Sequence, residues 1–241
     1  MALSRNATSL INFVLDRCLP PIIREQRWFY RLILKRAIQG DVNAYLDFRQ
    51  RCWRMTPEEL QAFYGSIRSN IDRPTDCNDG SIARVLACVK EHQPQRILEF
   101  GCGRGHLASL ILDGHQVDYT GVDFNTQKAR EVLGDRARLI DGVSLDGLAD
   151  DERFDLVITT HTLEHVLDLR EHMAGLLAHA AKTVLIIVPL QLNLRYTPDL
   201  HTRFWRTPGD FFLDAGVKPW MNPQWFVDQG DLCVILDVSQ P

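Results

Sequence analysis

Three glycines at alternate positions follow a short hydrophobic run in this chain. The segment Arg96–Phe100 has the composition of a buried strand, and Gly101, Gly103 and Gly105 come directly after it, before an apolar segment that begins at His106. Glycine lets a backbone turn tightly and pass close to a neighbouring group, because it has no Cβ. The first amides of the following helix stay free, which favours a polar or anionic ligand. The stretch therefore predicts a strand, a glycine turn and a helix, with a ligand at the turn.

Strand-like and helix-like segments alternate through the rest of the chain. This alternation predicts an α/β fold whose mostly parallel sheet has helices on both faces and ligands at the carboxyl ends of its strands. We expect strands at 96–100, 118–122, 137–140, 154–159, 183–188 and 232–238, the last paired with 220–227, and helices at about 106–112, 126–133, 169–180 and 207–216.

The first 80 residues lack this alternation and predict a helical extension, followed by a ligand-binding domain over 81–241. We expect a helix at 9–19, a break at Pro20-Pro21, and a second helix at 22–39. The second helix has an apolar stripe and a basic stripe at helical spacing. The apolar stripe is Ile22, Phe29, Ile33 and Ala37, and the basic stripe is Arg24, Arg27, Arg31 and Lys35.

Two further helix starts are expected in this extension. Thr56 and Glu59 form a capping box with Pro57 at the first helical position. Ser81 is expected to cap a helix after the polar loop 70–80, which either covers the ligand or serves as a linker.

Composition limits the classes of function. The chain has 241 residues and a net charge of −4, which gives no broad attraction to nucleic acid. We expect no membrane span, because no apolar stretch reaches the length that a span needs, and no signal peptide. Its six cysteines include no Cys-x-x-Cys pair, so we expect reduced thiols in a cytoplasmic protein.

Two motifs resemble those of class I S-adenosylmethionine-dependent methyltransferases. The run from Glu99 to Gly105 resembles their motif I, and 154–166 is similar to motif IV of their small-molecule branch. The resemblance implies a Rossmann-like fold with a seven-stranded sheet and S-adenosylmethionine as cofactor. The position of the third glycine of a dinucleotide fingerprint is His106, which argues against a nicotinamide-dependent oxidoreductase.

The resemblance and the strand ends together select the residues that would bind the cofactor. Asp123 closes the second strand, where a carboxylate can accept both ribose hydroxyls, and Asp141 with Gly142 closes the third strand. Either acid is also compatible with an ordinary helix start or turn. The full set is Glu99, Gly101, Cys102, Gly103, Gly105, Asp123, Phe124, Asp141, Gly142, Thr160 and His161.

Transfer to a sugar hydroxyl would need a general base, and histidine suits neutral pH. The candidates are His165, His161 and His201, in that order. His161 and His165 could also share a helix face and, with Glu164, bind a metal, although we favour local hydrogen bonding and assign no metal. Aromatic candidates for the acceptor pocket are Tyr196, Trp205 and Trp225.

The strand-four tip has Thr160-His161-Thr162-Leu163 in place of the D/N-P-P-Y/F of base-amine methyltransferases, which argues against a nucleic-acid substrate. The leader, with Pro20-Pro21, Trp28 and Arg73–Asn78, resembles that of bacterial methyltransferases encoded with surface-glycan genes. We therefore expect a small-molecule or glycan acceptor, with a sugar hydroxyl favoured.

The basic second helix leaves two interpretations open. Its charged face is either simply solvated or contacts an anionic membrane surface or a lipid-linked substrate. A catalytically silent adaptor that keeps the fold and docks through these helices is the main alternative function.

Overall fold

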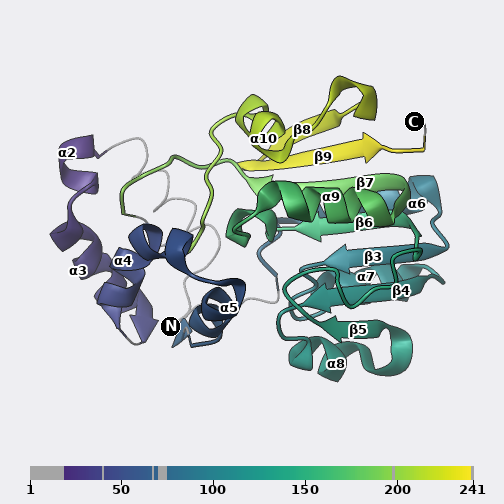
Figure 1. Ribbon diagram of the computed structural model, residues 1–241, viewed down its shortest axis with the longest axis horizontal. Helices are drawn as coiled ribbons and strands as arrows, with labels where there is room; N and C mark the ends of the chain where they lie inside the picture. Colours follow the sequence, from purple (N-terminus) through teal and green to yellow (C-terminus); the bar gives the residue numbers. More distant parts are fainter. Residues whose placement is uncertain (1–18, 40, 67, 70–74, 197–198, 240–241) are drawn as a thin grey trace. The chain divides into compact units, whose positions relative to one another are not determined.

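The computed structural model of the chain describes residues 19–39, 41–66, 68–69, 75–196 and 199–239 (Figure 1). The chain forms two compact units. One, the helical unit, consists of residues 1–73 and 192–204, and the other, the sheet unit, consists of 74–191 and 205–241. The sequence predicted a single boundary at residue 80. In the structure the helical unit ends at residue 73 and also contains the internal segment 192–204. The helix expected at 9–19 lies outside the described residues.

The sheet unit is built on seven strands in the order β5-β4-β3-β6-β7-β9-β8. The first five in this order are parallel, β9 is antiparallel to β7, and β8 is antiparallel to β9. The Rossmann-like fold predicted from the sequence is confirmed. The strands are β3 (Arg96–Phe100), β4 (Asp118–Asp123), β5 (Arg138–Asp141), β6 (Phe154–Thr160), β7 (Ala180–Pro189), β8 (Gln224–Asp228) and β9 (Asp231–Asp237).

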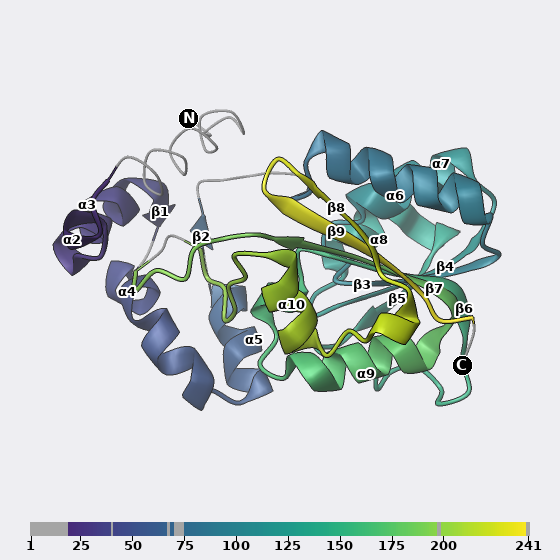
Figure 2. The same ribbon diagram turned by 90° about the horizontal axis from the view of Figure 1, so that it is seen from above.

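Helices cover both faces of this sheet, as the two views show (Figures 1 and 2). One face carries α6 (Asp79–His92), α7 (His106–Gly114) and α8 (Gln127–Leu133), and the other carries α9 (Leu169–His179) and α10 (Pro208–Ala215).

Residues alternate along each strand between two apolar cores, one under each layer of helices. In β3, for example, Leu98 faces the α9 side and Ile97 faces the α6 side. Short 3-10 turns, η3 (Gly134–Arg136), η4 (Leu163–His165) and η5 (Pro219–Met221), complete the unit.

Two helix starts show how local sequence fixes the boundaries. The α10 helix begins with a capping box, in which the Thr207 side chain accepts from the Asp210 N–H and the Asp210 side chain accepts from the Thr207 N–H. The α6 helix begins two residues before the expected Ser81. Its cap is Asn78, whose Oδ1 accepts the Ser81 N–H at 2.8 Å.

The helical unit contains shorter helices than the sequence indicated. The segment expected as one helix at 22–39 is split after Arg24, and Ile38–Gln39 is a strand. The elements are α2 (Pro21–Arg24), α3 (Arg27–Ala37), β1 (Ile38–Gln39), α4 (Val42–Arg51), η2 (Cys52–Arg54), α5 (Pro57–Ser66) and β2 (Arg68–Ser69). The Thr56–Glu59 capping box before α5 is present, with bonds of 2.9 and 3.2 Å.

The segment 192–204 belongs to the helical unit because its backbone is bonded to the helices. Tyr64 of α5 donates its hydroxyl to the Leu200 carbonyl at 2.8 Å. Arg49 of α4 donates to the Leu194 carbonyl and lies 4.4 Å above the Phe204 ring. The chain therefore leaves the sheet after β7, joins the N-terminal helices, and returns before α10.

Two predictions from composition can be checked in the described part of the chain. None of its helices is long and apolar enough to cross a lipid bilayer. Its cysteines are free and buried: Cys52, Cys77, Cys88, Cys102 and Cys233. Burial raises the pKa of Cys88 to about 12 and that of Cys233 to about 11, so both thiols stay protonated at neutral pH.

Candidate functional site at the carboxyl edge of the sheet

The residues selected from the sequence gather at one edge of the sheet, where the parallel strands end. Gly101 follows β3, Asp123 and Asp141 close β4 and β5, and Thr160 closes β6. Asp231 reaches the same edge from the opposite direction, because it opens β9 and pairs with Pro189 at the end of β7. The fold thus creates a single site from segments far apart in the sequence.

The three glycines of the turn have different roles. All have positive φ, namely 85°, 52° and 76° for Gly101, Gly103 and Gly105. A Cβ on Gly101 would lie 1.8 Å from the Thr162 Oγ1, and one on Gly105 would lie 3.1 Å from the Leu133 side chain. These two glycines therefore admit protein neighbours and not a ligand, contrary to the simplest interpretation of the motif. Within the described structure, a Cβ on Gly103 would meet no atom within 4 Å.

Asp123 connects the glycine turn to the end of β4. Its Oδ2 accepts the Gly103 N–H at 2.8 Å, and its Oδ1 accepts the Asn125 N–H at 3.2 Å. Burial raises the pKa of Asp123, and the two N–H bonds oppose that rise. Each carboxylate oxygen has a second lone pair, so the group can still accept bonds from a diol. Phe124, the next residue, is 40% exposed and offers an aromatic face beside it.

Asp141 serves the start of α8. Its Oδ1 accepts both the N–H and the hydroxyl of Thr126, at 2.8 and 2.9 Å, and these bonds lower its pKa. Its Oδ2 lies 3.6 Å from Arg130. Gly142 donates its N–H to the Asp123 carbonyl at 2.8 Å, which fixes the spacing of the two strand ends. Oδ1 is thus committed to the start of α8, and the Asp141 side chain as a whole is 61% exposed.

Glu99 and Cys102 both turn into the interior. Glu99 is 1% exposed and accepts the hydroxyl of Tyr119. Burial raises the pKa of Glu99 to about 7, Tyr119 lowers it, and the nearby Asp123 charge raises it. The Cys102 side chain packs in the core on the α6 side, where it lies 2.9 Å from the position of a Cβ on Gly121. Only the backbone of Cys102 is therefore available to a ligand.

His161 is held between two carboxylates at the tip of β6. Its Nε2 lies 3.2 Å from the Asp231 Oδ2, and its Nδ1 lies 3.5 Å from the Glu164 Oε1. Burial alone lowers the pKa of His161, but the bonds to Asp231 and Glu164 outweigh burial and raise it well above its usual value. The two carboxylates therefore favour the protonated imidazole, the form that cannot accept a further proton as a general base.

The same network joins three elements of the sheet unit. Asp231 also accepts from Asn78 at 2.7 Å and from the Ser81 hydroxyl at 3.0 Å, both on α6 or its cap. His161 has a φ of 50°, a backbone conformation that residues other than glycine rarely adopt. A strained backbone that is held by several buried bonds is typical of functional sites.

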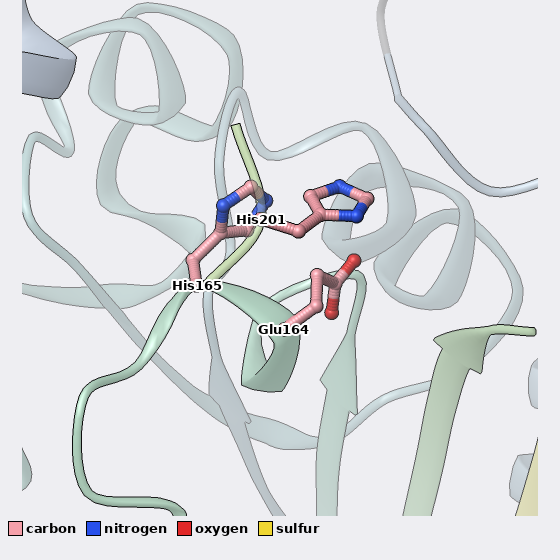
Figure 3. Close-up of side chains that lie close together, drawn as sticks. All are labelled: Glu164, His165 and His201. Carbon is pink, nitrogen blue, oxygen red and sulfur yellow. The ribbon is translucent and has the colours of Figure 1, made fainter. Parts of the chain in front are cut away.

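His165 and Glu164 lie on η4, a single 3-10 turn, and not on the helix face that the metal hypothesis required. Figure 3 shows both side chains projecting from this turn. Both ring nitrogens of His161 face carboxylates, Asp231 at 3.2 Å and Glu164 at 3.5 Å. His201, the third candidate base, belongs to the helical unit.

The three aromatic residues expected in the acceptor pocket have other positions. Trp205 is 2% exposed and donates its Nε1–H to Asp214 at 2.9 Å, so it is a core residue of the sheet unit. Tyr196 is buried in the core of the helical unit. Trp225 lies on the edge strand β8 and is 49% exposed. Size and aromaticity alone could not separate a core position from a pocket.

Three important residues of the site were not predicted. Tyr119 is the partner of Glu99, Thr162 fills the space left by Gly101, and Asp231 holds His161. Asp231 comes directly before the last apolar run of the chain. Its position at the start of a predicted strand was the sequence feature that could have marked it as a site residue. The alternation of side chains along β4 could have placed Tyr119 on the same face as Glu99, because Glu99 pairs with Gly121, two residues after Tyr119.

Comparison with known proteins gives a consistent result. A family model described as a methyltransferase domain matches residues 73–217, which is more than half of the chain. An uncharacterized methyltransferase of Geobacillus thermodenitrificans is 32% identical over 94 residues, covering 38% of this chain and 43% of that protein. One from Anoxybacillus flavithermus is 26% identical over 117 residues, covering 47% and 54%. The matched region thus spans about half of each relative.

Solved structures share the fold at low sequence identity. A crystal structure of the plantazolicin methyltransferase BpumL in complex with a triazolic desmethylPZN analog and SAH has a TM-score of 0.53 at 13% identity, covering 81% of this chain and 97% of that one. The methyltransferase domain of bacterial CtHen1-CN has a TM-score of 0.50 at 19% identity, covering 65% and 96%. At these identities the likeness concerns the fold.

Proposed function

Because the chain belongs to the methyltransferase-domain family, we propose that it binds S-adenosylmethionine at the carboxyl edge of its sheet and methylates an oxygen atom of a small molecule or glycan. The observation that carries the proposal is the glycine turn. Gly103 alone of its three glycines faces open space within the described structure, and its N–H is anchored by Asp123 at 2.8 Å. Such a turn presents backbone beside a carboxylate that can accept a ribose diol.

The residues present fit this cofactor. Asp123 would accept the ribose hydroxyls, Phe124 would face the adenine, and Asp141 would accept from its amine through Oδ2. The backbone at Gly103 and at Thr160 would border the methionine part. Bound there, S-adenosylmethionine would supply an electrophilic methyl group.

The protein's own contribution is to align the acceptor oxygen, exclude water and, for a sugar hydroxyl, remove a proton. Alignment of two reactants can supply several kcal/mol of the barrier, about 7 to 11 in well-oriented cases. A sugar hydroxyl has a pKa far above 7 and needs a base, whereas a carboxylate or phosphate acceptor needs none. His165 is the first candidate and His201 the second, because the proton of His161 is held by Asp231 and Glu164.

The choice of an oxygen acceptor is supported by the sequence of the β6 tip. Thr160-His161-Thr162-Leu163 replaces the motif that holds the exocyclic amines of nucleic-acid bases. The preference for a sugar hydroxyl derives from the resemblance of the leader to methyltransferases encoded with surface-glycan genes.

The proposal is tested with S-adenosylmethionine labelled in its methyl group and a panel of nucleotide-linked and lipid-linked sugars. With a sugar acceptor, His165→Ala should lower turnover by about 100-fold or more and leave the affinity for S-adenosylhomocysteine unchanged. His115→Ala is the control, since His115 follows α7 at the opposite edge of the sheet. Unchanged turnover in His165→Ala would remove this residue from catalysis. Cofactor binding without transfer to any acceptor would favour the adaptor.

A further inference from the structure

The α3 helix presents apolar side chains on two opposite sides. Tyr30 and Leu34, each 1% exposed, face inward and pack with Tyr45, Leu46 and Tyr196 in the core of the helical unit. Of the apolar stripe that the sequence suggested, Phe29 packs against this core, whereas Ile22 is 76% exposed. One inward stripe is what a surface helix needs to dock on its own domain.

The other side of α3 is also apolar but lies in solvent. Trp28 is 58% exposed and Leu32 is 54% exposed, and their spacing of four residues places them together. The preceding helix α2 adds Ile22, which is 76% exposed, and Ile23, which is 36% exposed. Single exposed apolar residues are ordinary, whereas four of them within eleven residues of chain indicate a contact surface.

Positive charge borders this patch. Arg31 and Lys35 are exposed and lie three and seven residues after Trp28, hence on the same side of α3. The sequence of α3 contains no acidic residue, and the nearest acid before it is Glu25. Among the described residues neither Arg31 nor Lys35 has a carboxylate oxygen within 4.0 Å, in contrast to Arg27, which pairs with Asp47.

Arg27 differs from the other members of the basic stripe. Its guanidinium pairs with Asp47 of α4 and lies 3.3 Å from the Asn43 Oδ1. This ion pair connects α3 to α4. Among the described side chains of α3, Arg31 and Lys35 are the basic groups left for a partner.

We propose that this outward face, defined by Ile22, Ile23, Trp28, Arg31, Leu32 and Lys35, docks on the surface of an anionic lipid bilayer. A helix with a basic rim and a Trp–Leu stripe suits the boundary between headgroups and acyl chains, where tryptophan is enriched. A second copy of the chain is disfavoured, because a two-fold contact would bring Arg31 and Lys35 toward their own equivalents. The inference is independent of the proposed methyl transfer.

Vesicle co-sedimentation of the full-length protein tests this inference, with phosphatidylcholine vesicles and with vesicles that also contain phosphatidylglycerol. Binding should require phosphatidylglycerol and weaken as salt is raised. The double variant R31Q/K35Q should bind about 25-fold more weakly, at roughly fivefold for each charge near the surface. The variant W28A/L32A should bind at least about tenfold more weakly.

Two matched controls separate this face from general effects. Lys90→Gln removes an exposed charge from α6, and Trp220→Ala removes a tryptophan that is 63% exposed on η5. Both should bind like the unmodified protein. All replaced side chains are exposed, so every variant should retain its thermal midpoint, which is measured alongside.

Three outcomes would overturn the inference. One is the absence of binding to phosphatidylglycerol vesicles, and another is equal binding to both kinds of vesicle. The third is a dimer in light scattering that W28A/L32A dissociates, which would assign the face to a second copy.

Discussion

Replacing Gly103 by alanine tests the glycine turn with little disturbance of the core. Gly103 has a φ of 52°, and a Cβ there would meet no described atom within 4 Å. The substitution should therefore cost only the strain of a left-handed L residue, about 1 to 2 kcal/mol. The thermal midpoint should fall by about 2 to 8 °C.

The effect on cofactor binding should be larger than this loss of stability suggests. In our account the added methyl group occupies space that the ligand needs, and overpacking of this kind costs about 1 to 3 kcal/mol. The dissociation constant for S-adenosylhomocysteine should rise by about 5- to 150-fold. Isothermal titration calorimetry measures it directly.

Gly134 supplies the control. Its φ of 57° and ψ of −132° also disfavour an L residue, and a Cβ there would likewise meet no described atom within 4 Å. It follows α8 and precedes β5, so it lies at the opposite edge of the sheet. Gly134→Ala should lose at least as much stability as Gly103→Ala and keep its affinity within about twofold. Equal affinities in the two variants would refute the assignment of Gly103 to the ligand.

Three further predictions concern the groups around the site. The pKa of Glu99 is about 7 in the folded state and about 4.5 in the unfolded state, so the free energy of unfolding should fall by up to about 3 kcal/mol as pH rises through this window. Glu99→Gln should flatten this pH dependence, which urea unfolding at pH 5 and at pH 8 measures. His161→Gln should lower the free energy of unfolding by about 3 to 5 kcal/mol, because two buried carboxylates lose their cation. The contribution of His161 should be full below pH of about 6.5 and be lost as pH rises through its raised pKa, so a urea midpoint unchanged between wild type and variant would contradict the network. Thr207→Ala should cost about 1 kcal/mol through loss of the α10 cap without changing cofactor affinity, and a calorimetric shift in that affinity would argue against a purely structural role.

The sheet could be predicted from the sequence because each of its strands is marked by a pattern within a short segment of the chain. Continuous apolar runs such as 183–188 indicate strands buried on both faces, and the glycine turn at 101–105 indicates where a strand passes into a helix. Since parallel strands end at one edge, the position of Asp123 and Asp141 followed from the strand order alone.

The remaining features depend on contacts between distant segments. His161 and Asp231 are 70 residues apart, and nothing near either residue reveals that a charge pair fixes them. The membership of 192–204 in the helical unit depends on bonds such as that from Tyr64 to Leu200, which are 136 residues apart.

Periodicity was also ambiguous within the N-terminal helices. The α3 helix has two apolar stripes, and only the packing of Tyr30 and Leu34 shows which one faces the core. The break between α2 and α3 falls at Glu25 and Gln26, where no proline or glycine marks it in the sequence.

The central claim is that the carboxyl edge binds S-adenosylmethionine. Calorimetric titration of the full-length protein with S-adenosylhomocysteine, and separately with NADH, tests it most directly. Our account predicts micromolar binding of S-adenosylhomocysteine, weakened by Gly103→Ala, and no binding of NADH. Binding of NADH alone, or of neither ligand by a folded sample, would contradict it.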